Sequence, residues 1–255
     1  KRHSLPQGAR EESSVAFSNK VMETRDWYSL RSVPPKYDID SSVQYGRSMI
    51  EMLGVLAIIA VLSVGGIAGY SKAMEKYKVN KIVADYNMLI MGLLEHRENI
   101  INSIKGQSGE IYLNNLIVAA EIAPKAWTLN GRYLDDGYGN LVYPYATNEI
   151  RTQVDFPRIV LDFNLNGLST NENGSIVSAN FSDKLCMEIF NNLVVPLHSV
   201  LIRGYVYPYS DMMRYGDKYC GGNLKCIKDL SLSDIHNICN VCDRANKRCN
   251  ITIGF

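Results

Sequence analysis

The stretch Met49-Ile-Glu-Met-Leu-Gly-Val-Leu-Ala-Ile-Ile-Ala-Val-Leu-Ser-Val-Gly-Gly-Ile-Ala68 decides how this chain is built. Glu51 is its only charged residue, and beyond Glu51 only Ser63 and the glycines are not strongly apolar. About twenty apolar residues are what a helix needs to cross about 30 Å of hydrocarbon. Because the stretch is apolar on all sides, it is typical of a membrane-spanning helix.

A buried core helix and a secretory signal peptide are the two alternatives for this stretch. A core helix fits poorly, because the run is long and lies between two charged segments. A signal peptide has about 7–15 apolar residues followed by a cleavage site with small residues. Here the run is longer and continues into an amphipathic pattern, so we expect a membrane helix.

Beyond Gly69 the chain shows helical periodicity. Apolar residues recur three and four positions apart, with polar residues on the opposite face. This pattern predicts one helix from about Arg47 to Ile104, with Gly106 as its stop. We divide it into a transmembrane part at 47–70 and a helix spine at 71–105, within a globular domain covering 71–255. The recurring apolar residues are Met74, Tyr77, Ile82, Tyr86, Leu89, Ile90, Leu93 and Leu94.

The rest of the chain predicts an antiparallel sheet with short helices. Ser182 and Asp183 can cap a helix at 184–193, with Cys186 and Phe190 facing inward. The expected fold class is α+β: a long N-terminal membrane-spanning helix packed on a small antiparallel sheet of about four strands, with a cysteine-rich region at 208–255. A further short helix is expected at 112–122, and strands are expected at 141–145, 158–163, 174–181, 199–207 and 250–255.

Six cysteines follow the apolar run, five of them within the last thirty-six residues. An even number so concentrated predicts a disulfide framework in an oxidising space, with fifteen possible pairings. A zinc site at Cys239 and Cys242, near His236, is the alternative, but a second pair with ligand spacing is missing. The disulfide candidates are Cys186, Cys220, Cys226, Cys239, Cys242 and Cys249.

Charge gives little information on membrane orientation. Positive residues stand on both sides of the apolar run, so the positive-inside rule leaves the orientation ambiguous. The cysteines indicate that the part after the run lies outside the cytoplasm. The net charge of +1 argues against a broad nucleic-acid-binding surface.

The segment Gly46-Arg-Ser-Met-Ile-Glu51, followed by the apolar run, resembles the cleavage and methylation signal of type IV prepilins. That signal consists of a glycine, four residues, a glutamate and about twenty apolar residues. The order of later pieces resembles type IVb-class pilins, which the following residues match: Ala120, Ile122, Pro124, Gly137, Gly139 and Cys186.

The resemblance implies three site residues near the start of the helix. Prepilin peptidase would cut after Gly46, removing residues 1–46 as a cytoplasmic leader, and the new amine of Arg47 would be methylated. Phenylalanine or methionine is more usual at that position, so Arg47 is a departure from the family. The carboxylate of Glu51 would meet the free amine of a neighbouring subunit, because two opposite charges leave water together at lower cost than either alone.

The expected function is that of a structural subunit of a bacterial type IV pilus-like filament. The chain would cross the inner membrane once and then assemble into a cell-surface filament through its N-terminal helix. Its partners would be prepilin peptidase, other pilin subunits and the pilus assembly platform. A minor pilin or a type II secretion pseudopilin would share these features.

No catalytic site, metal site or cofactor is expected. The histidines His3, His96, His198 and His236 are scattered, and phosphate-loop and Ser-x-x-Lys motifs are missing. Two alternatives of other classes stay open. One is a single-pass membrane-anchored, disulfide-rich binding ectodomain that never polymerises. The other is an anchored thiol oxidoreductase using Cys239 and Cys242.

Overall fold

A computed structural model describes residues 49–150, 157–171, 173–244 and 248–255. The predictions for the leader, for Gly46 and for Arg47 lie outside these residues. The described chain has the expected α+β class: one long apolar N-terminal helix, an antiparallel sheet and three disulfides. The chain divides into two compact units after Val55, and the first turns of the long helix form the described part of the first unit.

The long helix α1 (Met49–Glu95) changes character along its length. Every residue from Met49 to Lys78 is exposed, and buried positions begin at Ile82. The expectation that Met74 and Tyr77 belong to the buried stripe is wrong: they are 45% and 64% exposed, because the layers packed on α1 begin only beyond them. The buried residues of α1 are Ile82, Asp85, Tyr86, Leu89, Ile90 and Leu93.

The expected helix to Ile104 is broken once. His96 leaves helical geometry at φ −96° and ψ 3°, and the short helix α2 (Arg97–Ser103) continues from it. Gly106 has a positive φ of 78°, which glycine adopts at low cost, so the predicted stop is confirmed. The apolar spacing runs unbroken through Ile100 and Ile104, which explains why the break left no signal in the pattern.

The main sheet has eight strands in the order β2-β3-β4-β5-β10-β8-β9, with β1 also pairing with β4. Four of the five expected strands form its centre, although the one expected at 199–207 begins only at Arg203, and all pairs are antiparallel. The additional strands are two or three residues long, too short to show alternation. The bounds are β1 (Glu110–Tyr112), β2 (Thr128–Asn130), β3 (Tyr133–Asp135), β4 (Leu141–Thr147), β5 (Arg158–Asn164), β8 (Arg203–Tyr207), β9 (Arg214–Tyr215) and β10 (Asn250–Gly254).

The strand expected at 174–181 is only partly correct. It is reduced to β7 (Ile176–Ser178), which pairs with β6 (Leu168–Thr170) in a separate two-stranded sheet. Strand β7 ends at Ser178. The hydroxyl of Ser178 donates to the Cys249 carbonyl and accepts from the Cys249 amide, both at 2.8 Å. These side-chain bonds replace the ladder that a longer strand would have formed.

Three further α-helices complete the fold, and two have side-chain caps. The Ser182 hydroxyl accepts from the Leu185 amide at the start of α4, as predicted. Ser231 and Asp234 form a capping box at the start of α5, which the sequence analysis missed. The helices are α3 (Asn114–Ala119), α4 (Asp183–Ile189, continued as a π-helix over Phe190–Val194) and α5 (Leu232–Cys239).

The hydrophobic core lies between the sheet and the helices on one of its faces. Alternate residues of β4, β5 and β10 join it together with residues of α1, α4 and α5. Tyr86 on α1 stacks on Phe163 of β5, with ring centroids 4.4 Å apart, and meets Trp127 edge-on at 5.8 Å. The remaining strand positions point to the opposite face, where polar and tyrosine side chains gather.

Candidate functional site

The exposed first part of α1 is the most unusual surface of the described chain. It carries fifteen large apolar side chains between 45% and 84% exposed, from Met49 to Tyr77. Single exposed apolar residues are ordinary, but a contiguous apolar surface marks a partner or a membrane. Among the described residues, α1 is the one helix long and apolar enough to cross a membrane, and none of its most apolar window is buried.

Glu51 lies in the first turn of α1 and is exposed. A carboxylate is favoured at this end, because the first amides of a helix have no intrahelical acceptor. No residue in the described part of the chain forms an ion pair with Glu51. The chain therefore presents one carboxylate on an apolar surface, at the end of the helix where a negative charge is favoured.

Four glycines lie on the exposed part of α1. A Cβ added at Gly54, Gly65, Gly66 or Gly69 would meet no atom within 4 Å. Gly65 and Gly69 are four positions apart, so they lie on the same face of the helix. Small residues at this spacing let another helix approach the backbone closely.

Charged residues mark the transition from the exposed apolar part to the packed part of α1. Lys184 at the start of α4 reaches Glu75 at 2.7 Å. Lys81 pairs with the largely buried Asp85 one turn further along, also at 2.7 Å. The Lys184–Glu75 pair is open to solvent, so it contributes little stability. It shows that the start of α4 lies beside α1.

All six cysteines form disulfides, as predicted. Cys186–Cys239 joins α4 to α5 across 53 residues and is buried. Cys220–Cys226 and Cys242–Cys249 close short loops, the second directly before β10. Disulfide sulfurs provide no thiolate for zinc.

The Cys-x-x-Cys sequence does not form a dithiol pair. Cys239 bonds to Cys186, and Cys242 bonds to Cys249, so the two cysteines belong to different bridges. A thioredoxin-type site needs both sulfurs in one exchangeable disulfide. Cys239 is also only 1% exposed, so an external thiol cannot reach its sulfur. This geometry does not favour the thiol oxidoreductase alternative.

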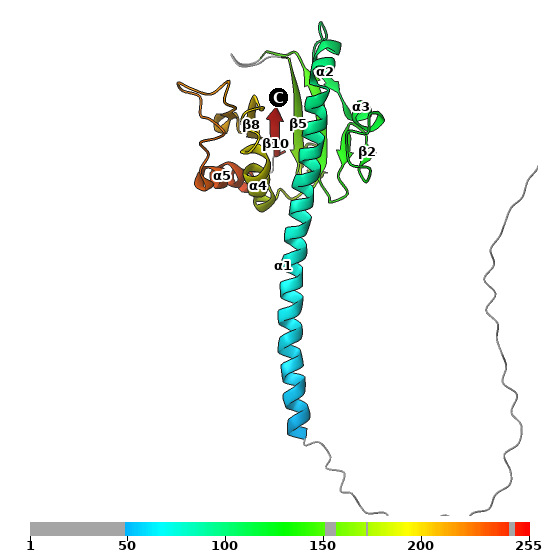
Figure 1. The fold of residues 1–255 in the computed structure, drawn as a ribbon, viewed down its shortest axis with the longest axis vertical. Coiled ribbons are helices and arrows are strands. Elements are labelled where there is room, and N and C mark those ends of the chain that lie inside the picture. Colours follow the sequence, from blue (N-terminus) through cyan, green and yellow to red (C-terminus); the bar gives the residue numbers. More distant parts are fainter. Residues whose placement is uncertain (1–48, 151–156, 172, 245–247) are drawn as a thin grey trace, which may run out of the picture. The chain divides into compact units, whose positions relative to one another are not determined.

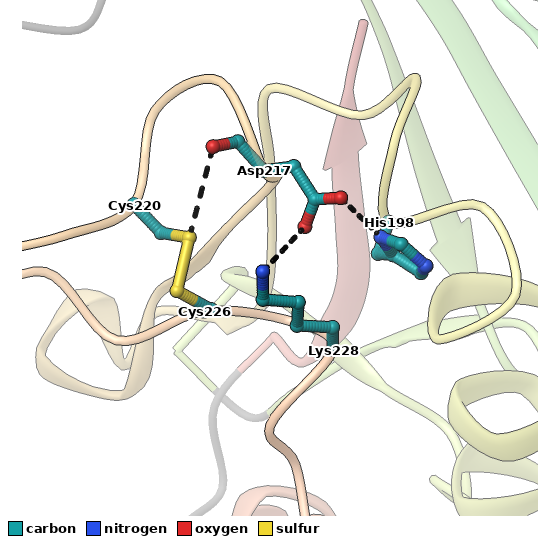
Figure 2. Close-up of a disulfide and its surroundings, with 5 residues drawn as sticks. All are labelled: His198, Asp217, Cys220, Cys226 and Lys228. Carbon is teal, nitrogen blue, oxygen red and sulfur yellow. Dashed lines mark hydrogen bonds and ion pairs between the residues drawn. A yellow bond between two sulfur atoms is a disulfide. The ribbon is translucent and has the colours of Figure 1, made fainter.

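The Cys220–Cys226 loop is held to the domain by a small polar cluster, which Figure 2 shows. Asp217 Oδ2 lies 2.9 Å from His198 Nδ1, and its Oδ1 lies 3.8 Å from Lys228 Nζ. The Asp217 amide also donates to the His198 carbonyl at 3.1 Å. The Cys220 sulfur lies 4.0 Å from the Asp217 carbonyl oxygen and, as part of a disulfide, has no proton to donate. The cluster positions a loop.

The three histidines in the described part of the chain remain apart from one another. His96 stands at the N-cap of α2, His198 pairs with Asp217, and His236 is exposed on α5. Within the described residues, groups of three or more His, Cys, Asp or Glu that could hold a metal ion are not found. Comparison with family models, curated proteins and solved structures finds no match for this chain. Its function is therefore inferred from its own residues.

Proposed function

We propose that this chain is a structural subunit of a type IV pilus-like filament. The observation that carries the proposal is the division of α1. The run from Met49 to Ala68 is exposed, apolar and bears the single carboxylate of Glu51, and the last part of α1 is the buried spine of an α+β domain. A helix of this kind can lie in a membrane before assembly and in the core of a helical bundle afterwards.

The position of Glu51 supports assembly over simple anchoring. A carboxylate within an apolar run costs about 2.5–3.5 kcal/mol at the centre of a bilayer, and less nearer the interface. An opposite charge from a neighbouring subunit would offset this cost and set the axial register between helices. The exposed glycines Gly65 and Gly69 support the same proposal, because they give a neighbouring helix room for close approach.

The disulfides support an extracytoplasmic domain, since such bonds persist in oxidising compartments. The N-terminal side would then be cytoplasmic, where prepilin peptidase cuts after Gly46 and the amine of Arg47 is methylated. Before assembly the chain would reside in the inner membrane of a bacterium, and it would then enter the filament through the pilus assembly platform. A minor pilin or a type II secretion pseudopilin is included in this proposal.

Processing is the first test. The full chain is co-expressed with a prepilin peptidase, and the N-terminus and intact mass of the membrane-extracted product are determined. We expect a product that begins at Arg47 and is lost in Gly46→Trp. A control prepilin is expressed in the same cells. If the control is cut and this chain is not, the pilin proposal is overturned in favour of the anchored ectodomain.

Assembly is the second test, and the helix offers a matched control. Glu51→Gln removes the charge while leaving the apolar run intact, and Glu95→Gln removes an exposed charge from the other end of the same helix. We expect both variants to be processed and Glu95→Gln to enter filaments as the wild type does. Filament yield should fall at least tenfold in Glu51→Gln. Equal yields in all three proteins would contradict the assembly role of Glu51.

A further inference from the structure

The sheet face opposite the helices carries a row of polar and aromatic side chains across four strands. The strand register aligns Tyr143 of β4 with Asp162 of β5, Asp162 with Thr252 of β10, and Thr252 with Tyr205 of β8. Because side chains alternate along each strand, all four lie on the face away from the core. This row is the centre of what we call the tyrosine face.

Aromatic rings cluster around one end of this row. The ring of Tyr143 has three tyrosine neighbours: Tyr112 at 5.7 Å, Tyr133 at 5.4 Å and Tyr145 at 5.2 Å between centroids. Tyr112 is 50% exposed, and at the other end of the row Tyr207 is 47% exposed. A tyrosine offers a flat apolar ring and a polar hydroxyl at low conformational cost, which suits it to ligand contact.

Hydrogen-bonding groups lie between the rings. Thr252 Oγ1 donates to Asp162 Oδ1 at 2.6 Å, and Asn250 Nδ2 donates to Thr252 Oγ1 at 2.9 Å. The Tyr143 hydroxyl donates to Glu110 Oε2 at 2.6 Å. The second oxygen of Asp162 has no donor among the described residues, although the side chain is only partly exposed. A half-buried acceptor of this kind favours a ligand that can donate.

These side chains line a hollow large enough for a small ligand. Its volume is about 530 Å³, and its lining includes Tyr145, Asp162, Tyr205 and Thr252. A second hollow of about 320 Å³ shares Glu110, Tyr145, Tyr205 and Tyr207 with the first, so the two adjoin. Ligand sites commonly occupy about 300–1,000 Å³ and combine apolar walls with a few placed polar groups.

We propose that the tyrosine face binds a neutral oligosaccharide. A pyranose ring has flat C–H faces, which pack on tyrosine rings, and a rim of hydroxyls, which both donate and accept hydrogen bonds. The rings would lie on tyrosines that line the hollow, such as Tyr133 and Tyr207, and the hydroxyls would reach Asp162 and Glu110. Binding requires no filament, so the inference stands independently of the proposed function.

The charges and the position of the hollow narrow the choice of ligand. Its lining holds two carboxylates, Glu110 and Asp162, and two guanidiniums, Arg132 and Arg248, so formal charges balance and favour an uncharged ligand. A proline-rich peptide also packs on tyrosines, but its proline nitrogens carry no proton for Asp162. Strand addition takes place at a sheet edge, whereas this hollow lies on a sheet face.

The test measures binding by the full chain, held in nanodiscs or in a detergent without a sugar headgroup. The probes are tetrasaccharides of glucose, galactose, mannose, N-acetylglucosamine and N-acetylgalactosamine. Tetragalacturonate and a proline decapeptide are the comparison ligands. We expect at least one neutral probe to bind saturably by titration calorimetry and to show saturation transfer from tyrosine protons.

Variants locate the site. Tyr207→Ala removes an exposed ring, and Asp162→Asn keeps the shape of the side chain while removing an acceptor. Each should weaken binding about tenfold or more, the effect of losing about 1.4 kcal/mol. Tyr77→Ala is the control, because Tyr77 is 64% exposed on α1, away from this face. Near-UV circular dichroism and an intact disulfide mass confirm that every variant is folded.

Three outcomes would overturn the proposal. The first is a folded chain that binds no neutral probe. The second is binding that survives both Tyr207→Ala and Asp162→Asn, which would place the site elsewhere. The third is binding of tetragalacturonate or the proline decapeptide alone, which would assign the face to an acidic glycan or to a peptide.

Discussion

At the scale of single residues, Asp136 is a buried carboxylate that accepts four hydrogen bonds. It is 2% exposed, and four donors meet its two oxygens. Oδ1 accepts from the backbone amides of Tyr138 and Asn140, and Oδ2 accepts from the Asn140 side chain and from the Tyr86 hydroxyl. Burial, with Asp136 adjacent, raises the pKa of Tyr86 well above its ordinary value, so the hydroxyl stays protonated and donates.

Removing this carboxylate should therefore destabilise the domain. Asp136→Ala leaves all four donors without this acceptor, at an expected cost of about 3 kcal/mol in the free energy of unfolding. Its neighbour Asp135 is the control, because it accepts a single bond from the Gly137 amide at the surface. Asp135→Ala should cost under about 1 kcal/mol. Guanidinium unfolding measures both free energies, and equal costs would show that the buried hydrogen bonds to Asp136 do not stabilise the domain.

Asp162 gives the domain a pH dependence. Burial raises its pKa to about 6, against the lowering effects of Thr252 and Arg248 and with a small further rise from Glu110. The folded state then holds a proton that the unfolded state releases near pH 4. The contribution of protonated Asp162 to the free energy of unfolding is therefore fully present below about pH 4, and it is lost as the pH rises through about 6.

Substitution isolates that contribution. Between pH 4 and pH 7, the unfolding free energy of the wild type should fall relative to that of the Asp162→Asn variant. The fall should be at most about 3 kcal/mol, since one pKa unit corresponds to about 1.36 kcal/mol. The partial exposure of Asp162 makes this an upper limit. Comparison of the two proteins by chemical denaturation at each pH cancels the titration of other carboxylates. A constant difference across the range would show that burial of Asp162 does not shift its pKa.

At the scale of elements, the sequence predicted those parts whose signals are local. The apolar run, the cap at Ser182 and the stop at Gly106 were each readable from neighbouring residues. The break at His96 was not, because the apolar spacing passes through it unchanged. The helix after Ser231 carried a readable capping-box signal that we overlooked. Of the tyrosine face, the sequence indicated only the segment Tyr205-Val-Tyr-Pro-Tyr209, as either a contact surface or sheet packing. The rest was not predicted, because it gathers side chains from several strands that only the register aligns.

Close packing of α1 on the chain before β2 depends on Gly92. A Cβ at this position would lie 2.6 Å from Cγ2 of Ile122, whereas a Cβ at Gly66 would meet nothing within 4 Å. Alanine favours a helix over glycine by about 1 kcal/mol, but overpacking typically costs about 1–3 kcal/mol. Gly92→Ala should thus destabilise the domain by about 1 kcal/mol, and Gly66→Ala should not destabilise it.

A double-mutant cycle checks the cause of that effect. Ile122→Ala removes the Cγ2 atom that the new methyl group would meet, so in this background Gly92→Ala should no longer destabilise. Thermal unfolding of the four proteins, followed by circular dichroism, gives the coupling energy. If Gly92→Ala lowers the unfolding free energy equally with Ile122 and with Ala at position 122, the contact with Ile122 is not what disfavours a side chain at position 92.

At the scale of the whole molecule, long-range connections close the domain. β10 lies between β5 and β8 in the middle of the sheet (Figure 1), so residues from the two ends of the domain sequence share one core. Cys186–Cys239 adds a covalent link between α4 and α5 on the helical side. The presence of disulfides was predictable from cysteine number and clustering. Their pairing was not, because it depends on which elements fold side by side.

The disulfides should differ in what they contribute. In the chain-entropy description, a bridge across 53 residues is worth about 4 kcal/mol and one across 6 residues about 2 kcal/mol. The Cys186→Ala/Cys239→Ala pair should lower the unfolding free energy by more than the Cys220→Ala/Cys226→Ala pair, because it also leaves space in the buried core. Guanidinium unfolding under non-reducing conditions compares the two with the wild type. A larger loss of unfolding free energy from the Cys220–Cys226 pair would contradict this expectation. It would mean that the polar cluster of His198, Asp217 and Lys228 depends on its disulfide, and that the loop, not the pair of helices, limits the stability of the domain.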